Sequence, residues 1–277
     1  MNKNKKINLV FSDLDGTALN EKFEFSPETK DVIKKLFAQG DVFIPITGRN
    51  ITNTVSLIKT LNNHEEIKFI IGHNGAQILD FSKKEFYKNN VIDRETIKKI
   101  FKSTYGRVGE VKIHFIGDKT TFSYGKSDDT EFWTKVMNKK YKIISDAQEI
   151  HEDINILMII LNENANEEDA KYMYELFSNH NGYKVHQYTN RVFEMSHCNS
   201  TKGAAALEVI GEYEKAGFEV ESWCFGDGMN DVTMFKVIDN PVAMANANDN
   251  LKVFAKFITT TNKENGIAKF IEENILN

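Results

Sequence analysis

Short apolar runs alternate with amphipathic stretches over the first 72 residues of the chain. A hydroxyl N-cap at Ser26 and a proline at the next position start one amphipathic stretch, and Gly40 ends it. The order of strand, helix, strand, helix and strand is typical of parallel pairing with right-handed crossovers. The pattern therefore predicts a doubly wound α/β sheet, with strands at 7–11, 41–47 and 68–72 and helices between Ser26 and Gly40 and at 50–61.

From about Asp80 the rhythm changes, because strands now arrive in pairs around turns, as at Val111–Ile116 and Thr120–Tyr124. This change favours an inserted α+β domain with an antiparallel sheet. After Lys202 the parallel pattern resumes. We expect a Rossmann-like core at residues 1–81 and 189–277 and an inserted domain at 82–188. The other expected strands are 141–144, 154–161, 183–188, 221–225, 242–244 and 257–260, and the other expected helices include 93–105, 127–139, 166–179, 202–216 and 263–274.

Composition and charge exclude several classes of protein. The 277 residues are 41% hydrophobic and 27% charged, which is ordinary for a globular protein. A net charge of −5 argues against nucleic-acid binding, for which a basic patch is expected. The apolar run behind the basic N-terminus is only five residues long, so neither a signal peptide nor a membrane anchor is expected. Cys198 and Cys224 fit neither a disulfide framework nor a zinc site, and a reducing cytoplasm is the expected location.

Two carboxylates directly follow the first apolar run, in the sequence Asp13-Leu14-Asp15-Gly16-Thr17. Alternate residues of an extended chain point the same way, so Asp13 and Asp15 start on one side. Like charges this close raise each other's pKa unless a cation lies between them, and Mg²⁺ is the usual partner of oxygen ligands. Gly16 lets the backbone approach a ligand, and Thr17 adds a hydroxyl where an anion could dock. A simple polar turn is the alternative, since Asp and Gly also favour turns.

Three other apolar strands end in polar residues in the same way. Ligands of open parallel sheets bind beyond the carboxyl ends of the strands, so we expect these four ends to converge. Asp227 and Asp231 would then join Asp13 and Asp15 in one cleft, and only a cation can hold such a charge together. The three strand ends are Thr47-Gly48-Arg49, His73-Asn74-Gly75 and Gly226-Asp227-Gly228-Met229-Asn230-Asp231.

This arrangement resembles the haloacid dehalogenase-like phosphohydrolases and, within them, the Cof-type sugar phosphatases, which carry a large cap between the second and third core motifs. The resemblance covers essentially the whole chain. Where the subgroup carries a proline and a glycine before the lysine of the third motif, this chain has His197 and Asn199, which puts the shape of that loop in question. The matching residues are Asp13–Thr17, Thr47, Lys202 in Ser200-Thr201-Lys202-Gly203, Gly226-Asp227 through Asn230-Asp231, and Asn74-Gly75-Ala76.

The resemblance implies a Mg²⁺-dependent phosphatase for small phosphorylated metabolites, and sugar phosphates above all. Asp13 would attack phosphorus and form an aspartyl-phosphate. Asp15 would protonate the leaving oxygen and later deprotonate the water that releases phosphate. Thr47 and Lys202 would hold the phosphoryl oxygens. The metal ligands would come from Asp13, Asp15 through its backbone carbonyl, Asp227 and Asp231, the last bound either directly or behind another ligand.

Substrate contacts are expected from Thr17, Gly48, Arg49, Asn74 and Asn230. Ordinary structural roles remain open for some of them, because Arg49 could pair with a structural acid and the Asn74 amide could tie a turn. Thr47 could equally be a helix cap. Lys202 would oppose the dipole of a helix in whose first turn it lies, so a nearby anion explains it better than solvent does.

The same residues leave two other functions open. A phosphotransferase or phosphomutase would share the Asp13 nucleophile but pass the phosphoryl group to a sugar hydroxyl. A non-catalytic, metal-binding regulatory module is the other alternative, although such a module has no need of a charge cluster that destabilises the metal-free fold. The expected partner is a small phosphorylated metabolite rather than nucleic acid or a membrane, and the sequence predicts no oligomeric state.

Overall fold

A parallel sheet forms the centre of the first part of the fold. The structure is a computed structural model that describes residues 5–106, 111–125, 130–131, 134–135, 139–161 and 165–276. Five strands pair in the order β14-β13-β12-β1-β2, and each neighbouring pair is parallel. The interior strand β1 buries Leu9, Val10 and Phe11 completely, as a parallel strand covered on both faces must. The strands are β1 (Lys5–Ser12), β2 (Val42–Pro45), β12 (Phe218–Gly226), β13 (Asn240–Ala243) and β14 (Phe257–Ile258).

The register of this sheet brings the functional strand ends to one level. Ser12 of β1 lies opposite Phe225 of β12 on one side and Pro45 of β2 on the other. The residues that follow these strands therefore leave the sheet side by side. Pro45 ends an edge strand, where its missing N–H costs no ladder hydrogen bond.

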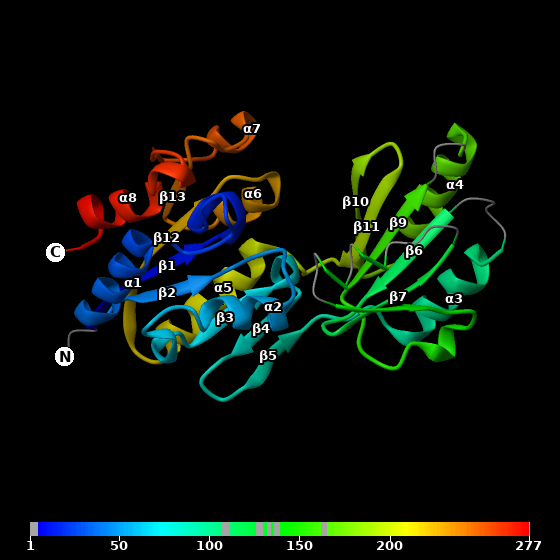
Figure 1. The fold of residues 1–277 in the computed structure, drawn as a ribbon, viewed down its shortest axis with the longest axis horizontal. Helices are drawn as coiled ribbons and strands as arrows, with labels where there is room; N and C mark the ends of the chain where they lie inside the picture. Colours follow the sequence, from blue (N-terminus) through cyan, green and yellow to red (C-terminus); the bar gives the residue numbers. More distant parts are fainter. Residues whose placement is uncertain are drawn as a thin grey trace. The chain divides into compact units, whose positions relative to one another are not determined.

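Helices cover this sheet, and their ends follow local rules. Ser26 caps α1 by accepting a hydrogen bond from the Thr29 N–H at 3.1 Å, and Gly40 ends the helix with φ of 91°. Helix α1 packs against α8, and α5 packs against α6 (Figure 1). The helices are α1 (Pro27–Gln39), α2 (Ile51–Ile58), α5 (Lys202–Lys215), α6 (Val232–Phe235), α7 (Asp249–Lys252) and α8 (Gly266–Asn274).

One strand of the predicted parallel sheet belongs elsewhere. β3 (Phe69–Gly72) touches the end of β2 through a single parallel bridge, Ile46 with Ile71, and pairs antiparallel with β4 (Gln77–Asp80). With β5 (Glu85–Asn89) it forms a three-stranded sheet. The prediction missed β4 and β5, because the tight turn after Gly72 sends the chain straight back instead of into a helix.

The inserted part of the chain forms a six-stranded sheet in the order β10-β11-β9-β6-β7-β8. The sheet is antiparallel except where β7 pairs with β8. Helices α3 (Arg94–Thr104) and α4 (Glu167–Ser178) share its hydrophobic core (Figure 1). The expected helix at 127–139 falls mostly outside the described residues. The strands are β6 (Val111–Ile116), β7 (Thr120–Tyr124), β8 (Lys140–Ile143), β9 (Ile156–Leu161), β10 (Tyr183–Thr189) and β11 (Val192–His197).

The fold class is therefore confirmed as an α/β core with an inserted, mostly antiparallel region. Two compact units are present, one made of Met1–Lys88 with Ser200–Asn277 and the other of Asn89–Asn199. Each boundary of the second unit lies several residues downstream of the corresponding boundary of the expected insertion at 82–188. β5 belongs with β4 in the first unit, and the unpredicted β11 pairs with β9 and β10 in the second. In the described part of the chain no helix combines the length and apolar character needed to cross a membrane.

Candidate active site

Asp13 directly follows β1, at the start of a backbone turn. Its N–H donates to the Phe225 carbonyl at 3.0 Å, which continues the β1–β12 ladder by one residue. The chain then forms a wide turn over Leu14–Ala18, with Gly16 in the left-handed region at φ of 76°. The Asp13 residue is only 6% exposed, so its carboxyl group is held in a nearly dry position.

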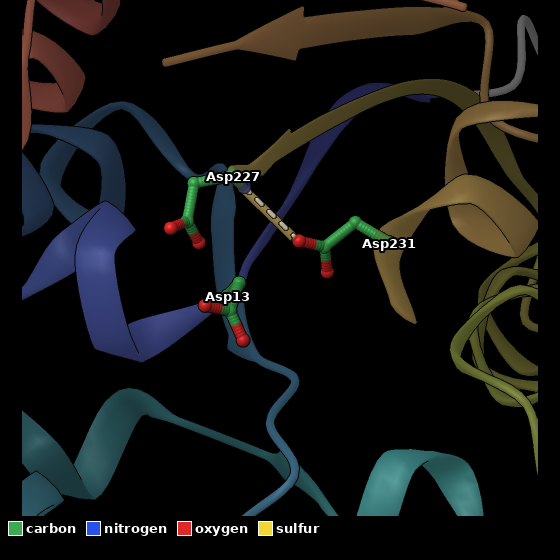
Figure 2. Close-up of side chains that lie close together, drawn as sticks. All are labelled: Asp13, Asp227 and Asp231. Atoms are coloured by element: carbon green, nitrogen blue, oxygen red, sulfur yellow. Dashed lines mark hydrogen bonds between the residues drawn. The ribbon is translucent and has the colours of Figure 1, made fainter. Parts of the chain in front are cut away.

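Three carboxyl groups from two strand ends converge at this point (Figure 2). Asp13, Asp227 and Asp231 each offer an oxygen, and these atoms lie within 4.8 Å of one another. The fully buried ammonium group of Lys202 donates to Asp13 Oδ1 at 2.5 Å and to Asp231 Oδ1 at 2.6 Å. The position of Lys202 in the first turn of a helix predicted a nearby anion. The carboxylates of Asp13 and Asp231 take this place.

Asp231 holds the loop after β12 as well as Lys202. Its Oδ2 accepts a hydrogen bond from the N–H group of Asp227 at 3.0 Å (Figure 2) and another from that of Gly228 at 3.0 Å. Both of its oxygens thus have protein partners, and the side chain is completely buried. Through these contacts Asp231 holds Lys202 and the backbone of Asp227 in position.

The donor set fits a divalent cation. Three carboxylates and one ammonium group leave two formal negative charges in a largely buried cluster, and such charge is unfavourable without a counter-ion. Carboxylate oxygens are the ligands that hard ions such as Mg²⁺ prefer. Asp13 and Asp227 are the residues that would hold the ion, because the oxygens of Asp231 are already engaged.

The pKa values of the cluster reflect this excess of negative charge. Burial raises the pKa of Asp13 above its ordinary value, Lys202 opposes the shift, and the charges of Asp231 and Asp227 add to it. Burial, with the charge of Asp231, raises the pKa of Asp227 to about 6. Burial disfavours the charge of Lys202, yet Asp13 and Asp231 raise its pKa above the ordinary value. Without a metal ion, Asp13 and Asp227 therefore resist ionisation.

The raised pKa of Asp227 predicts how the metal-free protein responds to pH. A carboxyl group whose pKa rises from 3.8 to about 6 on folding stabilises the fold fully below pH 3.8, and this contribution is lost as the pH rises through about 6. In the presence of a chelator, the wild type should lose stability relative to Asp227→Asn as the pH rises from 3.8 to about 6. Urea unfolding of both proteins across this range measures the difference. A constant difference would show that Asp227 ionises in the folded protein as it does in the unfolded one.

Gly16 is required by the close approach of two loops. A Cβ atom built on Gly16 would lie 2.3 Å from Asp227 Oδ2, and the left-handed backbone there is itself unfavourable for alanine. Gly16→Ala should lower turnover at least about a hundredfold, since it displaces a reacting group, and should cost about 1–2 kcal/mol of stability. Gly211→Ala in α5 is the matched control, because a Cβ there meets nothing within 4 Å. Equal turnover in the two variants would contradict the assigned contact.

The proposed acid and base, Asp15, is paired with Arg49. Arg49 Nε donates to Asp15 Oδ2 at 2.7 Å, and its Nη2 donates to Asp15 Oδ1. The Asp15 side chain is 41% exposed and lies outside the cluster of three carboxylates. The Arg49 guanidinium also lies 5.8 Å from the centre of the Phe23 ring. The open question about Arg49 thus has a structural answer, because its partner is an acid of the expected reaction.

Thr47 and Asn74 belong to one set of interlocked loops. Buried Thr47 accepts a hydrogen bond on its Oγ1 from the Arg49 N–H at 3.1 Å. The Asn74 N–H donates to the Thr47 carbonyl at 2.9 Å, and its Oδ1 accepts from Asn230 Nδ2 at 3.0 Å. A Cβ at Gly48 would lie 3.2 Å from that same Oδ1. Asn74 therefore ties the loops after β2, β3 and β12 together, and it does so with a left-handed backbone at φ of 53°.

The structure also shows the contacts of Thr17 and of the loop before Lys202. Thr17 donates from its hydroxyl to Asp227 Oδ1 at 3.1 Å, so it orients a carboxylate of the cluster.

Thr201 caps α5 by accepting from the Ala204 N–H at 3.1 Å, which fixes Lys202 at the first position of the helix. Before it, the Asn199 N–H donates to His197 Nδ1 at 3.2 Å, and neither residue has a positive φ. The loop is thus closed without the proline and glycine of the subgroup.

Sequence reasoning assigned no role to Asn246. Its Nδ2 donates to the Gly16 carbonyl at 2.9 Å, and its Oδ1 accepts from the Asn262 N–H at 3.0 Å. It therefore holds the turn after Asp13 from the loop after β13. An asparagine in a polar turn carries no signal of such a distant contact, so only the structure reveals it.

Comparison with known proteins gives consistent results. The sequence model of the family described as haloacid dehalogenase-like hydrolase matches residues 10–271. The chain is 27% identical to the 5-amino-6-(5-phospho-D-ribitylamino)uracil phosphatase YwtE of Bacillus subtilis (94% of this chain, 96% of that protein) and 26% identical to the phosphatase of the same description, YcsE, from that organism (98% and 96%). The crystal structure of TM0651 from Thermotoga maritima has the same fold, with a TM-score of 0.79, 24% identity and coverage of 99% of this chain and 98% of that one.

Proposed function

The chain belongs to the haloacid dehalogenase-like hydrolase family, and on this basis we propose that it is a Mg²⁺-dependent phosphatase acting on sugar phosphates through an aspartyl-phosphate on Asp13. It is a phosphatase of phosphorylated metabolites within the Cof-type subgroup of that family. The metal, the covalent intermediate and the sugar portion are the parts that we propose.

A single observation carries the proposal. Asp13 directly follows β1 and contacts Lys202 at 2.5 Å, while its carboxyl group lies in one cluster with Asp227. A nucleophile, a cation for phosphoryl oxygens and a second carboxylate for a metal are thus in contact at the carboxyl ends of β1 and β12. Structural packing alone does not explain a buried cluster with an excess of negative charge.

The residues divide the reaction between them. A carboxylate oxygen of Asp13 attacks phosphorus, the bond from phosphorus to the leaving oxygen breaks, and Asp15 supplies the proton that this oxygen takes up. Asp15 then accepts a proton from the water that cleaves the aspartyl-phosphate. Bound Mg²⁺ would neutralise the Asp13 carboxylate and a phosphoryl oxygen together. Lys202 and Thr47 stabilise the other phosphoryl oxygens.

The ion pair of Asp15 adds a condition to this sequence. Arg49 donates to both oxygens of the Asp15 carboxylate. Asp15 has to carry a proton to act as the acid, and a neutral carboxyl group binds the guanidinium of Arg49 more weakly than a carboxylate does. Protonation of Asp15 and its release from Arg49 are therefore coupled.

The nature of the leaving group follows from two considerations. The relatives YwtE and YcsE are described as acting on a phosphate carried by a ribityl chain, which is a reduced sugar. The loops around Asp15 present amide and guanidinium donors, including Arg49 and Asn230, which suit hydroxyl oxygens. We therefore include sugar-alcohol phosphates in the proposed substrate class, and we propose that the inserted region acts as the cap domain that selects among them.

The test is phosphate release from a panel of sugar and sugar-alcohol phosphates, with Mg²⁺ and with a chelator. We expect release that requires the metal and that is lost in Asp13→Asn. Adding glucose or ribose as an acceptor separates hydrolysis from transfer, because a transferase would form a new phosphate ester and release little phosphate. Metal-independent release, or release that persists in Asp13→Asn, would refute the proposed mechanism.

A further inference from the structure

Phe23 is an exposed aromatic residue at the tip of a rigid turn. Its residue exposure is 62%, and its backbone is left-handed at φ of 60°. Left-handed backbone is uncommon outside glycine, asparagine and aspartate, and for a bulky side chain it is an outlier. The position combines two unfavourable features, an apolar ring in water and a strained backbone, next to the proposed active site.

The turn that carries Phe23 is held by its own hydrogen bonds. The Phe23 N–H donates to the Asn20 carbonyl at 3.0 Å, and the Asn20 N–H donates to the Glu24 carbonyl at 2.9 Å. The side chain of Asn20 accepts from the N–H groups of Lys22 and Glu24. Asn262 Nδ2 donates to the Leu19 carbonyl at 2.9 Å and anchors the base of the turn. These hydrogen bonds fix the backbone of the turn that carries the Phe23 ring.

Phe23 is connected through Arg49 to Asp15, the residue proposed to protonate the leaving oxygen of the substrate. The ring centre lies 5.8 Å from the Arg49 guanidinium carbon, and Arg49 holds both oxygens of Asp15. The leaving oxygen must contact Asp15 to take up its proton. The remainder of the leaving group extends from that oxygen, so the residues around Asp15 are the ones it can meet.

We propose that Phe23 is a specificity-determining residue whose ring stacks on a flat ring carried by the leaving group, so that the preferred substrates are phosphate esters bearing a planar aromatic or heterocyclic ring. The inference rests on the proposed function and deepens it. Exposed aromatic faces bind planar rings through stacking and buried apolar area. Strain that persists beside a reaction centre is a recognised sign of a functional role.

Two other features show why the position is informative. Lys84 has the same φ of 60° in the turn between β4 and β5, but its charged side chain is well solvated there. Phe86 is exposed to 46% on β5, and its backbone is not left-handed. Phe23 differs from both because it is aromatic, strained and in contact with Arg49.

The test uses two esters that share one phosphorylated chain. Ribitol 5-phosphate and flavin mononucleotide both carry a ribityl phosphate, and only the second bears a planar ring system. The wild type should prefer the flavin ester by about tenfold in kcat/KM, an effect of the size that ring stacking supplies. Phe23→Leu should reduce this ratio to about one through the KM of the flavin ester, and Phe23→Tyr should restore it. Phe86→Leu, the matched control, should keep the wild-type ratio.

A binding measurement gives a second readout. Isothermal titration calorimetry of Asp13→Asn with flavin mononucleotide reports binding without turnover. Adding Phe23→Leu to this variant should weaken this binding about tenfold.

The outcomes separate the two proposals. An unchanged ratio in Phe23→Leu overturns the inference, as does release from sugar phosphates without release from the flavin ester. An equal fall on both esters also overturns it, since Phe23 would then act through Arg49 and Asp15. Absence of release from every ester by the wild type refutes the proposed function itself, and the inference with it.

Discussion

Asp13→Asn is expected to lower phosphate release by at least about four orders of magnitude, because the amide cannot form the phosphoenzyme and loss of a nucleophile costs on this scale. The fold should persist. The Asp13 carboxyl group is nearly buried, and Lys202 keeps Asp231 as its second partner when Asp13 loses its charge. Steady-state phosphate release with Mg²⁺ and a sugar phosphate measures the effect.

The same variant should be more stable than the wild type when no metal is bound. Burial raises the pKa of Asp13, so its ionised form is unfavourable in the folded protein at pH 8. We expect a higher urea midpoint for Asp13→Asn than for the wild type in the presence of a chelator, and a smaller stabilisation by Mg²⁺.

Asp41→Asn provides the control for this experiment, since Asp41 is equally buried but is bonded to Asn8 and lies outside the cluster. It should retain wild-type turnover. Substantial activity in Asp13→Asn would remove Asp13 from the role of nucleophile, and equal loss in both variants would indicate a general effect on folding.

The strand ends were predictable from the sequence because two simple rules act there. Apolar runs that stop at polar residues identify buried strands, and parallel pairing places their ends at one edge. The register of β1 with β12 and β2 then brings Asp13 and Asp227 together. Three of the four acids that were expected in one cleft form the cluster, while Asp15 lies outside it.

The contacts between side chains could not be predicted in the same way. The pairing of Arg49 with Asp15 depends on the direction of two half-buried side chains, and several acids were available to the arginine. The partners of Asp231 depend on a tight loop whose two N–H groups turn inward. The strand β4 was missed because only the backbone at His73 and Asn74, left-handed at both residues, shows that the chain reverses there.

Lys202→Met is expected to destabilise the protein by about 3–5 kcal/mol, because it leaves buried carboxylates without the ammonium group that they share. Asp231 is completely buried, and Lys202 is the cationic partner of both Asp231 and Asp13. Turnover should also be lost, since no cation then faces the phosphoryl oxygens. Urea unfolding in a chelator measures the first effect and phosphate release the second.

The double variant Lys202→Met with Asp231→Asn separates stability from catalysis. Removing the charge of Asp231 takes away most of the unpaired negative charge, so this protein should recover much of the lost stability while turnover stays absent. Mg²⁺ should stabilise the single variant more than it stabilises the wild type, because Lys202 no longer competes for Asp231 and Asp13. A single variant as stable as the wild type would contradict the ion pairs.

Lys139→Met is the matched control, because it removes a lysine that is also buried but has a different environment. Lys139 donates to the Gly117 carbonyl, and burial lowers its pKa to about 8. Its charge is therefore poorly compensated, and its removal should cost less stability than the removal of Lys202 and leave turnover at the wild-type level. If both lysine variants lost turnover equally, burial of a lysine would explain the result, and the specific role of Lys202 between Asp13 and Asp231 would fail.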